Sequence, residues 1–179
     1  MRFTIRDDSS NLQNLDGIVV FVFDDMSTER LDTSIAKKLL DIRSRNIFHG
    51  KSGEVYTTLI NSGRFKTNPK TLFFSGLGKK EHFSAEQIRL SSGLVTQKIS
   101  YEGLSKVAVD INSIIPFMDG QVIGQSIAEG FVLSDYRFDR FKSSKKSEKD
   151  RNRIKEIVVF VGSKFSKDMK KGIKLGEIF

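Results

Sequence analysis

The residues of this sequence that could carry out chemistry are few and far apart. The two histidines, His49 and His82, stand 33 positions apart, and neither belongs to a spacing such as HExxH that directs two side chains to one metal ion. There is no cysteine, which excludes disulfides, thiolate nucleophiles and zinc sites with cysteine ligands. No GxSxG pattern is present. The sequence therefore predicts no catalytic residue, no metal ligand and no cofactor-binding residue in this chain.

Two short patterns follow predicted strands, which is where α/β domains place their ligands. Gly76-Leu77-Gly78 lacks the third glycine of a dinucleotide fingerprint and the GK[ST] ending of a P-loop. Its amides, those of Gly76 and Gly78, could still meet a phosphate at the start of the next helix; the alternative is a plain turn from strand to helix. Asp24-Asp25 is a pair of adjacent carboxylates, but acidic residues are also common in turns, and no base or nucleophile accompanies the pair.

Positive charge is concentrated near the end of the sequence. The chain has 30 Lys and Arg against 22 Asp and Glu, a net charge of +8. Residues 137–174 contain 14 basic and 5 acidic residues, so the whole excess lies there. Such a segment could attract nucleic acid or an acidic partner. The alternative is a solvated loop followed by an amphipathic helix.

Length and hydropathy indicate one soluble domain. A chain of 179 residues is long enough to bury a core. The longest apolar run, residues 18–23, is too short to cross a bilayer, and the first residues lack the apolar core of a signal peptide. We therefore expect a cytoplasmic protein that does not associate with membranes.

Apolar periodicity predicts six strands and four helices. In chain order the elements run β-β-α-β-β-α-β-α-β-α, and the first helix is expected to be capped by Ser27 or Thr28. The predicted strands cover residues 2–6, 18–23, 54–60, 71–75, 106–111 and 154–161, and the helices cover 31–42, a segment from Ser84, 119–136 and 166–179. This order favours an α/β domain with helices on both faces of a mixed sheet.

Three stretches resemble the N-terminal domain of the leucyl (cytosol) aminopeptidase family. Residues 48–54 are similar to that family's F-x-G-K-x-G-E loop, and residues 72–80 resemble its strand followed by GLGK. The strongest resemblance is at residues 129–143, where the family has a helix ending in Y-x-F-D-x-Y/F-K, before a lysine-rich loop and a hydrophobic strand. The matches run in order from Gly17 to Phe179. The resemblance implies a three-layer, macro-domain-like α/β fold.

The resemblance also implies that catalysis takes place outside this chain. In the family a larger C-terminal domain binds two divalent metals, zinc or manganese, and hydrolyses peptides. Its Asn-Thr-Asp-Ala-Glu-Gly-Arg stretch is absent here, so no ligand or catalytic residue is carried over. Residues 1–170 would be the accessory domain, and residues 171–179 would begin the linker helix to an absent catalytic domain. The expected partners are that catalytic domain and further copies in a hexamer.

Three functions follow from these observations. The leading one is a non-catalytic domain that supports oligomer assembly and limits access to the active site of a cytosolic aminopeptidase. The second is a free-standing macro-like domain that binds ADP-ribose or another nucleotide through Gly76 to Gly78 and Asp24. The third is nucleic-acid binding through residues 137–174. Aromatic and arginine residues are favoured at interfaces, which suggests that one short segment anchors the assembly. The alternative is that its phenylalanines only pack a loop onto the core. The segment consists of Arg137, Phe138, Asp139, Arg140, Phe141 and Lys142.

Overall fold

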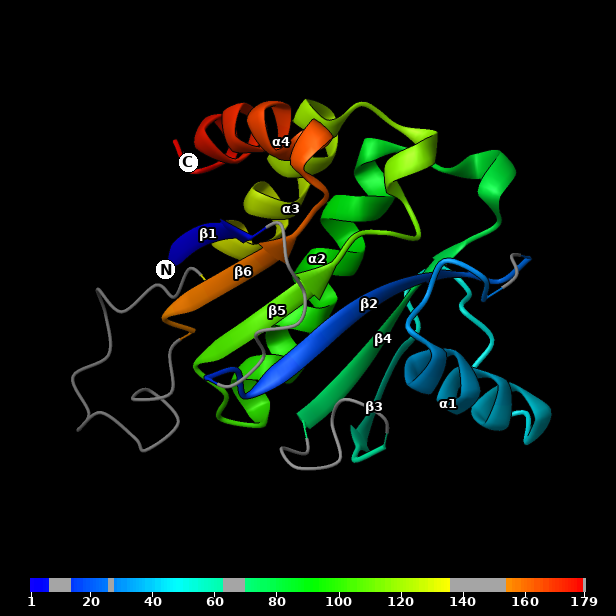
Figure 1. Cartoon of the computed structure of the whole chain (residues 1–179). Helices are drawn as coiled ribbons and strands as arrows, with labels where there is room; N and C mark the ends of the chain where they lie inside the picture. The colour runs from blue at the N-terminus through cyan, green and yellow to red at the C-terminus, as the bar shows by residue number, and fades with distance from the viewer. Residues whose placement is uncertain (7–13, 26–27, 63–69, 136–153, 179) are drawn as a thin grey trace.

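The computed structural model describes residues 1–6, 14–25, 28–62, 70–135 and 154–178. These residues form a six-stranded sheet in the order β1-β6-β5-β2-β4-β3 (Figure 1). Neighbouring strands are parallel except for β3 and β4, which are antiparallel. The mixed sheet predicted from the sequence is therefore confirmed. Its strands are β1 (Arg2–Arg6), β2 (Gly17–Phe23), β3 (Val55–Ile60), β4 (Lys70–Gly78), β5 (Lys106–Asp110) and β6 (Glu156–Phe160).

Helices cover both faces of the sheet. One face packs against α1 (Thr33–Ser44), and the other packs against α2 (Ala85–Tyr101), α3 (Gly120–Asp135) and α4 (Ser163–Gly176) (Figure 1). Among the described residues, the connections contain two short 3-10 helices, η2 (Lys80–His82) and η3 (Ile115–Phe117). The elements of the sheet and the four long helices follow one another in the predicted order. The expected α/β class, with helices on both faces of a mixed sheet, is confirmed.

The unbroken apolar run of β2 reflects its central place in the sheet. Successive side chains of a strand point to opposite faces. Val19, Phe21 and Phe23 accordingly enter the core under α2 and α3, whereas Val20 and Val22 enter the core under α1. Both faces are covered, so polar residues are excluded from either side of this strand.

Helix α1 begins later than the sequence suggested. Its N-cap is Asp32, whose Oδ1 accepts a hydrogen bond from the amide of Ser34 at 2.9 Å. The predicted cap at Ser27 or Thr28 is therefore wrong. Ser84, at which the sequence predicted the second helix to begin, is the N-cap of α2, and its amide donates to Oε1 of Gln87 at 2.9 Å.

A buried carboxylate ties the first strand to the last. Glu156 of β6 accepts a hydrogen bond from Thr4 at 2.8 Å and forms ion pairs with Arg2 at 3.2 Å and Lys106 at 2.9 Å. The hydrogen bond from Lys106, which outweighs the effect of burial, together with those from Thr4 and Arg2, lowers the pKa of Glu156 to about 2. The charged carboxylate therefore holds β1, β5 and β6 together on the face that carries α1.

Helices α3 and α4 approach each other closely. A Cβ added at Gly172 of α4 would overlap the carbonyl oxygen of Gln121, and one at Gly124 of α3 would lie 2.6 Å from the carbonyl oxygen of Met169. Glycine at these positions lets the two backbones touch, and this contact seats α4 beside β1. No helix among the described residues is long and apolar enough to cross a membrane.

Candidate functional site at the carboxyl ends of β2 and β4

Parallel strands β2 and β4 end at the same edge of the sheet, and the loop before β3 folds over them. The amide of Asp24 donates to the carbonyl of Gly78 at 3.1 Å. The amide of Gly78 donates to Gly50 at 2.9 Å, and that of Gly76 donates to Glu54 at 2.8 Å. The structure thus brings together three patterns that the sequence singled out separately. We call this group the carboxyl-edge cluster: Asp24, Arg43, residues 48–54, Gly76 and Gly78.

The carboxylate of Glu54 holds the loop of the cluster in shape. Its Oε2 accepts hydrogen bonds from the amides of His49 at 3.0 Å, Gly50 at 2.9 Å and Lys51 at 3.0 Å. Burial alone would raise the pKa of Glu54, but these three hydrogen bonds together outweigh it and lower that pKa below its ordinary value. Glu54 is therefore an ionised carboxylate whose interactions organise a turn.

Glycine is required where the loop lies on β4. A Cβ at Gly76 would overlap the carbonyl oxygen of Lys51, and it would lie 2.7 Å from the carbonyl carbon of Gly50. Gly78 has a φ of 74° and Gly50 a φ of 94°, in the left-handed region that favours glycine. The sequence pattern at Gly76 to Gly78 is explained by this close approach. Both amides of the pattern already donate to the chain's own carbonyls, and both glycines belong to β4 rather than to a turn before a helix.

Arg43 joins α1 to the same edge. Its guanidinium donates to the carbonyl of Phe23 and, at 3.1 Å, to the carbonyl of His49. Burial lowers the pKa of Arg43, while the nearby charge of Asp24 raises it. Oδ1 of Asp24 is enclosed and accepts no hydrogen bond from the described residues, so Arg43 supplies its compensating charge. Nothing in the sequence marked Arg43, since an arginine in the last turn of a helix is usually a surface residue.

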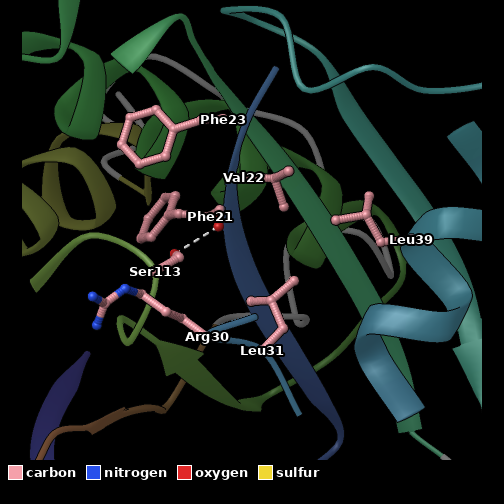
Figure 2. Close-up of a pocket in the computed structure, with 7 residues that line it drawn as sticks. All are labelled: Phe21, Val22, Phe23, Arg30, Leu31, Leu39 and Ser113. Carbon is pink, nitrogen blue, oxygen red and sulfur yellow. Dashed lines mark hydrogen bonds between the residues drawn. The ribbon is translucent and has the colours of Figure 1, made fainter. Parts of the chain in front are cut away.

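A hollow lies beside the cluster, where β2 and β5 end (Figure 2). After β2 the chain continues toward β4 and β3, whereas after β5 it continues toward β6. Open α/β sheets bind ligands at the point where the connections diverge in this way. Here Ser113 donates to the carbonyl of Phe21 at 2.7 Å, while Leu31 and Leu39 lie on the other side of β2 (Figure 2). The space that remains is enough for only about one water molecule. A nucleotide does not fit there without rearrangement.

The remaining predicted residues do not form a site among themselves. His82 is exposed in η2, where its Nε2 lies 3.3 Å from a carboxylate oxygen of Glu81, and Asp25 accepts a hydrogen bond from the amide of Lys80 at 3.0 Å. In the part of the chain that the structure describes, no three His, Asp or Glu side chains are close enough together to hold a metal. The described residues therefore do not provide the ligands of a two-metal centre such as the resemblance implies for the family's C-terminal domain. The predicted anchor, Arg137 to Lys142, lies outside the described residues.

Sequence comparison identifies relatives over most of the chain. Residues 19–145 match the family model described as "Cytosol aminopeptidase family, N-terminal domain". A probable cytosol aminopeptidase of Aquifex aeolicus is 30% identical over 167 residues, covering 90% of this chain and 30% of that protein. One of Sulfurihydrogenibium is 26% identical over 151 residues, covering 84% of this chain and 28% of that protein. The chain thus spans less than a third of the length of these relatives.

Solved structures share the fold. A mutant of tomato leucine aminopeptidase superposes with a TM-score of 0.67 at 15% identity, covering 94% of this chain and 34% of that chain. The bottromycin maturation enzyme BotP superposes with a TM-score of 0.61 at 17% identity, covering 91% of this chain and 30% of that chain. At such identities the likeness establishes the fold alone.

Proposed function

Because the chain belongs to the cytosol aminopeptidase family through that family's N-terminal domain, we propose that it is the non-catalytic N-terminal domain of a metal-dependent leucyl aminopeptidase. The whole enzyme would release N-terminal amino acids from peptides in the cytosol. Two divalent metals, zinc or manganese, would be held by the catalytic domain, which residues 171–179 would join to this one. Among the structural relatives, BotP has been solved in complex with Mn.

One observation carries the proposal: the chain matches the probable aminopeptidases over only about 30% of their length. The geometry of the carboxyl-edge cluster is in keeping with it. The family-like residues Glu54, Gly76 and Gly78 all serve to fix the loop on β4. The most recognisable residues of the domain therefore have a structural explanation that requires no bound ligand.

We propose two tasks for the domain within such an enzyme. It would support assembly into a hexamer, and it would stand near the active sites so that long or folded substrates enter less readily than short peptides. The anchor Arg137 to Lys142 remains our prediction for the contact between copies.

A chimera tests the second task. Three proteins would be compared. The first is the part of the Aquifex aeolicus relative that this chain does not match, the second is the same part with its own N-terminal segment, and the third is the same part with this chain instead of that segment. Hydrolysis of leucine p-nitroanilide and of a long unfolded polypeptide would be compared with manganese or zinc present. We expect the chimera to favour the short substrate over the polypeptide more strongly than the lone catalytic part does. Equal ratios would refute restriction of access, and hydrolysis by this chain alone would refute the non-catalytic assignment.

Nucleotide binding is not favoured by the geometry. The amides of Gly76 and Gly78 are already paired, and the hollow beside β2 holds little more than a water molecule. A thermal-shift titration with ADP-ribose is expected to leave the melting temperature unchanged at millimolar ligand, whereas stabilisation at that concentration would revive the alternative.

A further inference from the structure

Strand β1 and helix α4 lie side by side at the edge of the sheet far from β3 (Figure 1). A groove separates them. It encloses about 360 Å³, within the range of ligand sites in proteins. Phe3 and Ile5 of β1 and Ile173 of α4 give it an apolar floor, and Lys170 and Lys174 stand on its rim. No residue of the groove belongs to the carboxyl-edge cluster, and three of its lining residues, Ile173, Lys174 and Glu177, lie in the segment proposed to lead to the catalytic domain.

The floor of the groove adjoins β1, which is an edge strand of the sheet that the described residues form. β1 pairs only with β6 among the described strands. The amide of Arg2 donates to Lys155, and the carbonyl of Arg6 accepts from Val161. Backbone groups of a strand alternate in direction, so the amides and carbonyls of Phe3 and Ile5 point away from β6. Backbone groups of an edge strand that have no partner among the described residues form a template for another strand.

Two lysines, Lys170 and Lys174, and one carboxylate, Glu177, are the charged residues that line the groove, so its lining is net positive among the described residues. Lys164, Lys167, Lys170 and Lys174 are exposed on α4, and none has an ion pair within the part of the chain that the structure describes. Asp168 is already paired with Lys171 at 3.3 Å. Lys170 and Lys174 are one turn apart on the same helix face, so two ammonium groups stand beside the free edge of β1.

We propose that this groove binds an extended acidic segment of a partner protein, which adds to β1 as a further strand. A polypeptide in β conformation presents amides and carbonyls at the spacing of those of Phe3 and Ile5. Successive side chains of the added strand would point to opposite faces of the sheet. Its acidic side chains would lie on the face of α4, with their stems over Phe3 and Ile5 and their carboxylates at Lys170 and Lys174. The five residues of β1 span about 16 Å, which sets the length of the added strand at roughly five residues.

Charge argues against a second copy of this chain as the occupant. β1 begins and ends with arginine, and its neighbour α4 carries five lysines against one aspartate. Two such edges facing each other would bring like charges together, which destabilises cross-strand pairs. The proposal is independent of the aminopeptidase assignment, since binding is measured without any peptidase activity.

The test uses a fluorescein-labelled peptide of alternating valine and glutamate, titrated with the whole chain at low salt and followed by fluorescence anisotropy. We expect saturable binding that weakens at least tenfold in the double variant Lys170→Glu, Lys174→Glu. The matched control carries Lys37→Glu and Lys98→Glu, which reverse the same number of exposed charges on α1 and α2, and it should bind like the unchanged chain. No binding at millimolar protein, or equal loss in the control, would refute the proposal.

Two further peptides separate strand addition from simple charge attraction. One carries N-methyl groups on every valine and the other on every glutamate. Only one of these two sets of amides can face β1, so we expect one peptide to bind and the other to lose binding at least tenfold. If both bind equally, and single-stranded DNA displaces them, the groove attracts polyanions through charge alone and the proposed strand is wrong.

Discussion

Replacement of Glu54 by alanine tests the structural role assigned to the carboxyl-edge cluster. The change removes the single oxygen that accepts hydrogen bonds from the amides of His49, Gly50 and Lys51. A buried donor left without an acceptor costs about 1–3 kcal/mol. Gly50 is buried, His49 is half-buried and Lys51 is exposed, so water can replace the acceptor for Lys51 but not readily for the other two. The expected loss in the free energy of unfolding is therefore about 2–4 kcal/mol.

Two further variants make the result specific. Glu54→Gln keeps an oxygen acceptor but loses the charge, and charge-assisted hydrogen bonds are roughly twice as strong as neutral ones, so we expect about half the loss. Glu29→Ala removes an exposed carboxylate that has no hydrogen bond or ion pair among the described residues, and it should change little. Each kcal/mol lowers the melting temperature of a chain of this size by roughly 2–4 °C, which places Glu54→Ala on the order of 10 °C below the unchanged chain.

Urea unfolding at neutral pH gives the measurement. The chain has no tryptophan, so unfolding is best followed by far-ultraviolet circular dichroism. The pKa of Glu54 is lowered in the folded chain, so its contribution is present above the ordinary carboxyl pKa and is lost as pH falls through the lower, folded value. A Glu54→Ala chain within about 0.5 kcal/mol of the original would contradict the account of the loop.

Three other outcomes follow from the contacts described. Arg43→Ala leaves two carbonyls without a donor and is expected to cost about 2–3 kcal/mol in urea unfolding; a neutral result would remove Arg43 from the cluster. Gly172→Ala forces apart the backbones of α3 and α4 and should lower the free energy of unfolding by about 3 kcal/mol or more. The control Gly162→Ala adds a Cβ that meets nothing within 4 Å, so it should be near neutral. Similar melting temperatures for the two variants would contradict the close packing. The pKa of Glu156 is lowered to about 2, so its contribution is complete above the ordinary carboxyl pKa of 4.5 and fades as pH falls toward 2. The Glu156→Gln chain should therefore lose less stability over that acid range than the unchanged chain, and equal losses would argue against the ion pairs.

The fold could be predicted from the sequence because its signals are local. The apolar run at residues 18–23 and the helical spacing at residues 119–136 correspond to β2 and α3. The cap of α1 was missed because Ser27, Thr28 and Asp32 are all residue types that cap helices, and only the tertiary structure selects Asp32. The end of β4 was also missed, since Gly76 to Gly78 resembles a turn until the loop that lies on it is known.

The candidate site could be predicted only in part. The sequence singled out residues 48–54 and Gly76 to Gly78, and the structure brings them into contact. The sequence did not identify Arg43. This arginine donates to the backbone carbonyls of Phe23 and His49, and every residue type has such a carbonyl, so no sequence pattern marks them. The groove between β1 and α4 was also beyond local patterns, since the beginning and the end of the described chain meet there only after the sheet has formed.

The mass of the assembled chimera tests the central claim most directly. Native mass spectrometry would compare the unmatched part of the Aquifex aeolicus relative alone with the same part joined to this chain. If this chain is the N-terminal domain that supports assembly, the joined protein will be a hexamer and the lone part will form smaller species. A lone part that is already hexameric, or a joined protein that remains monomeric, would contradict the account.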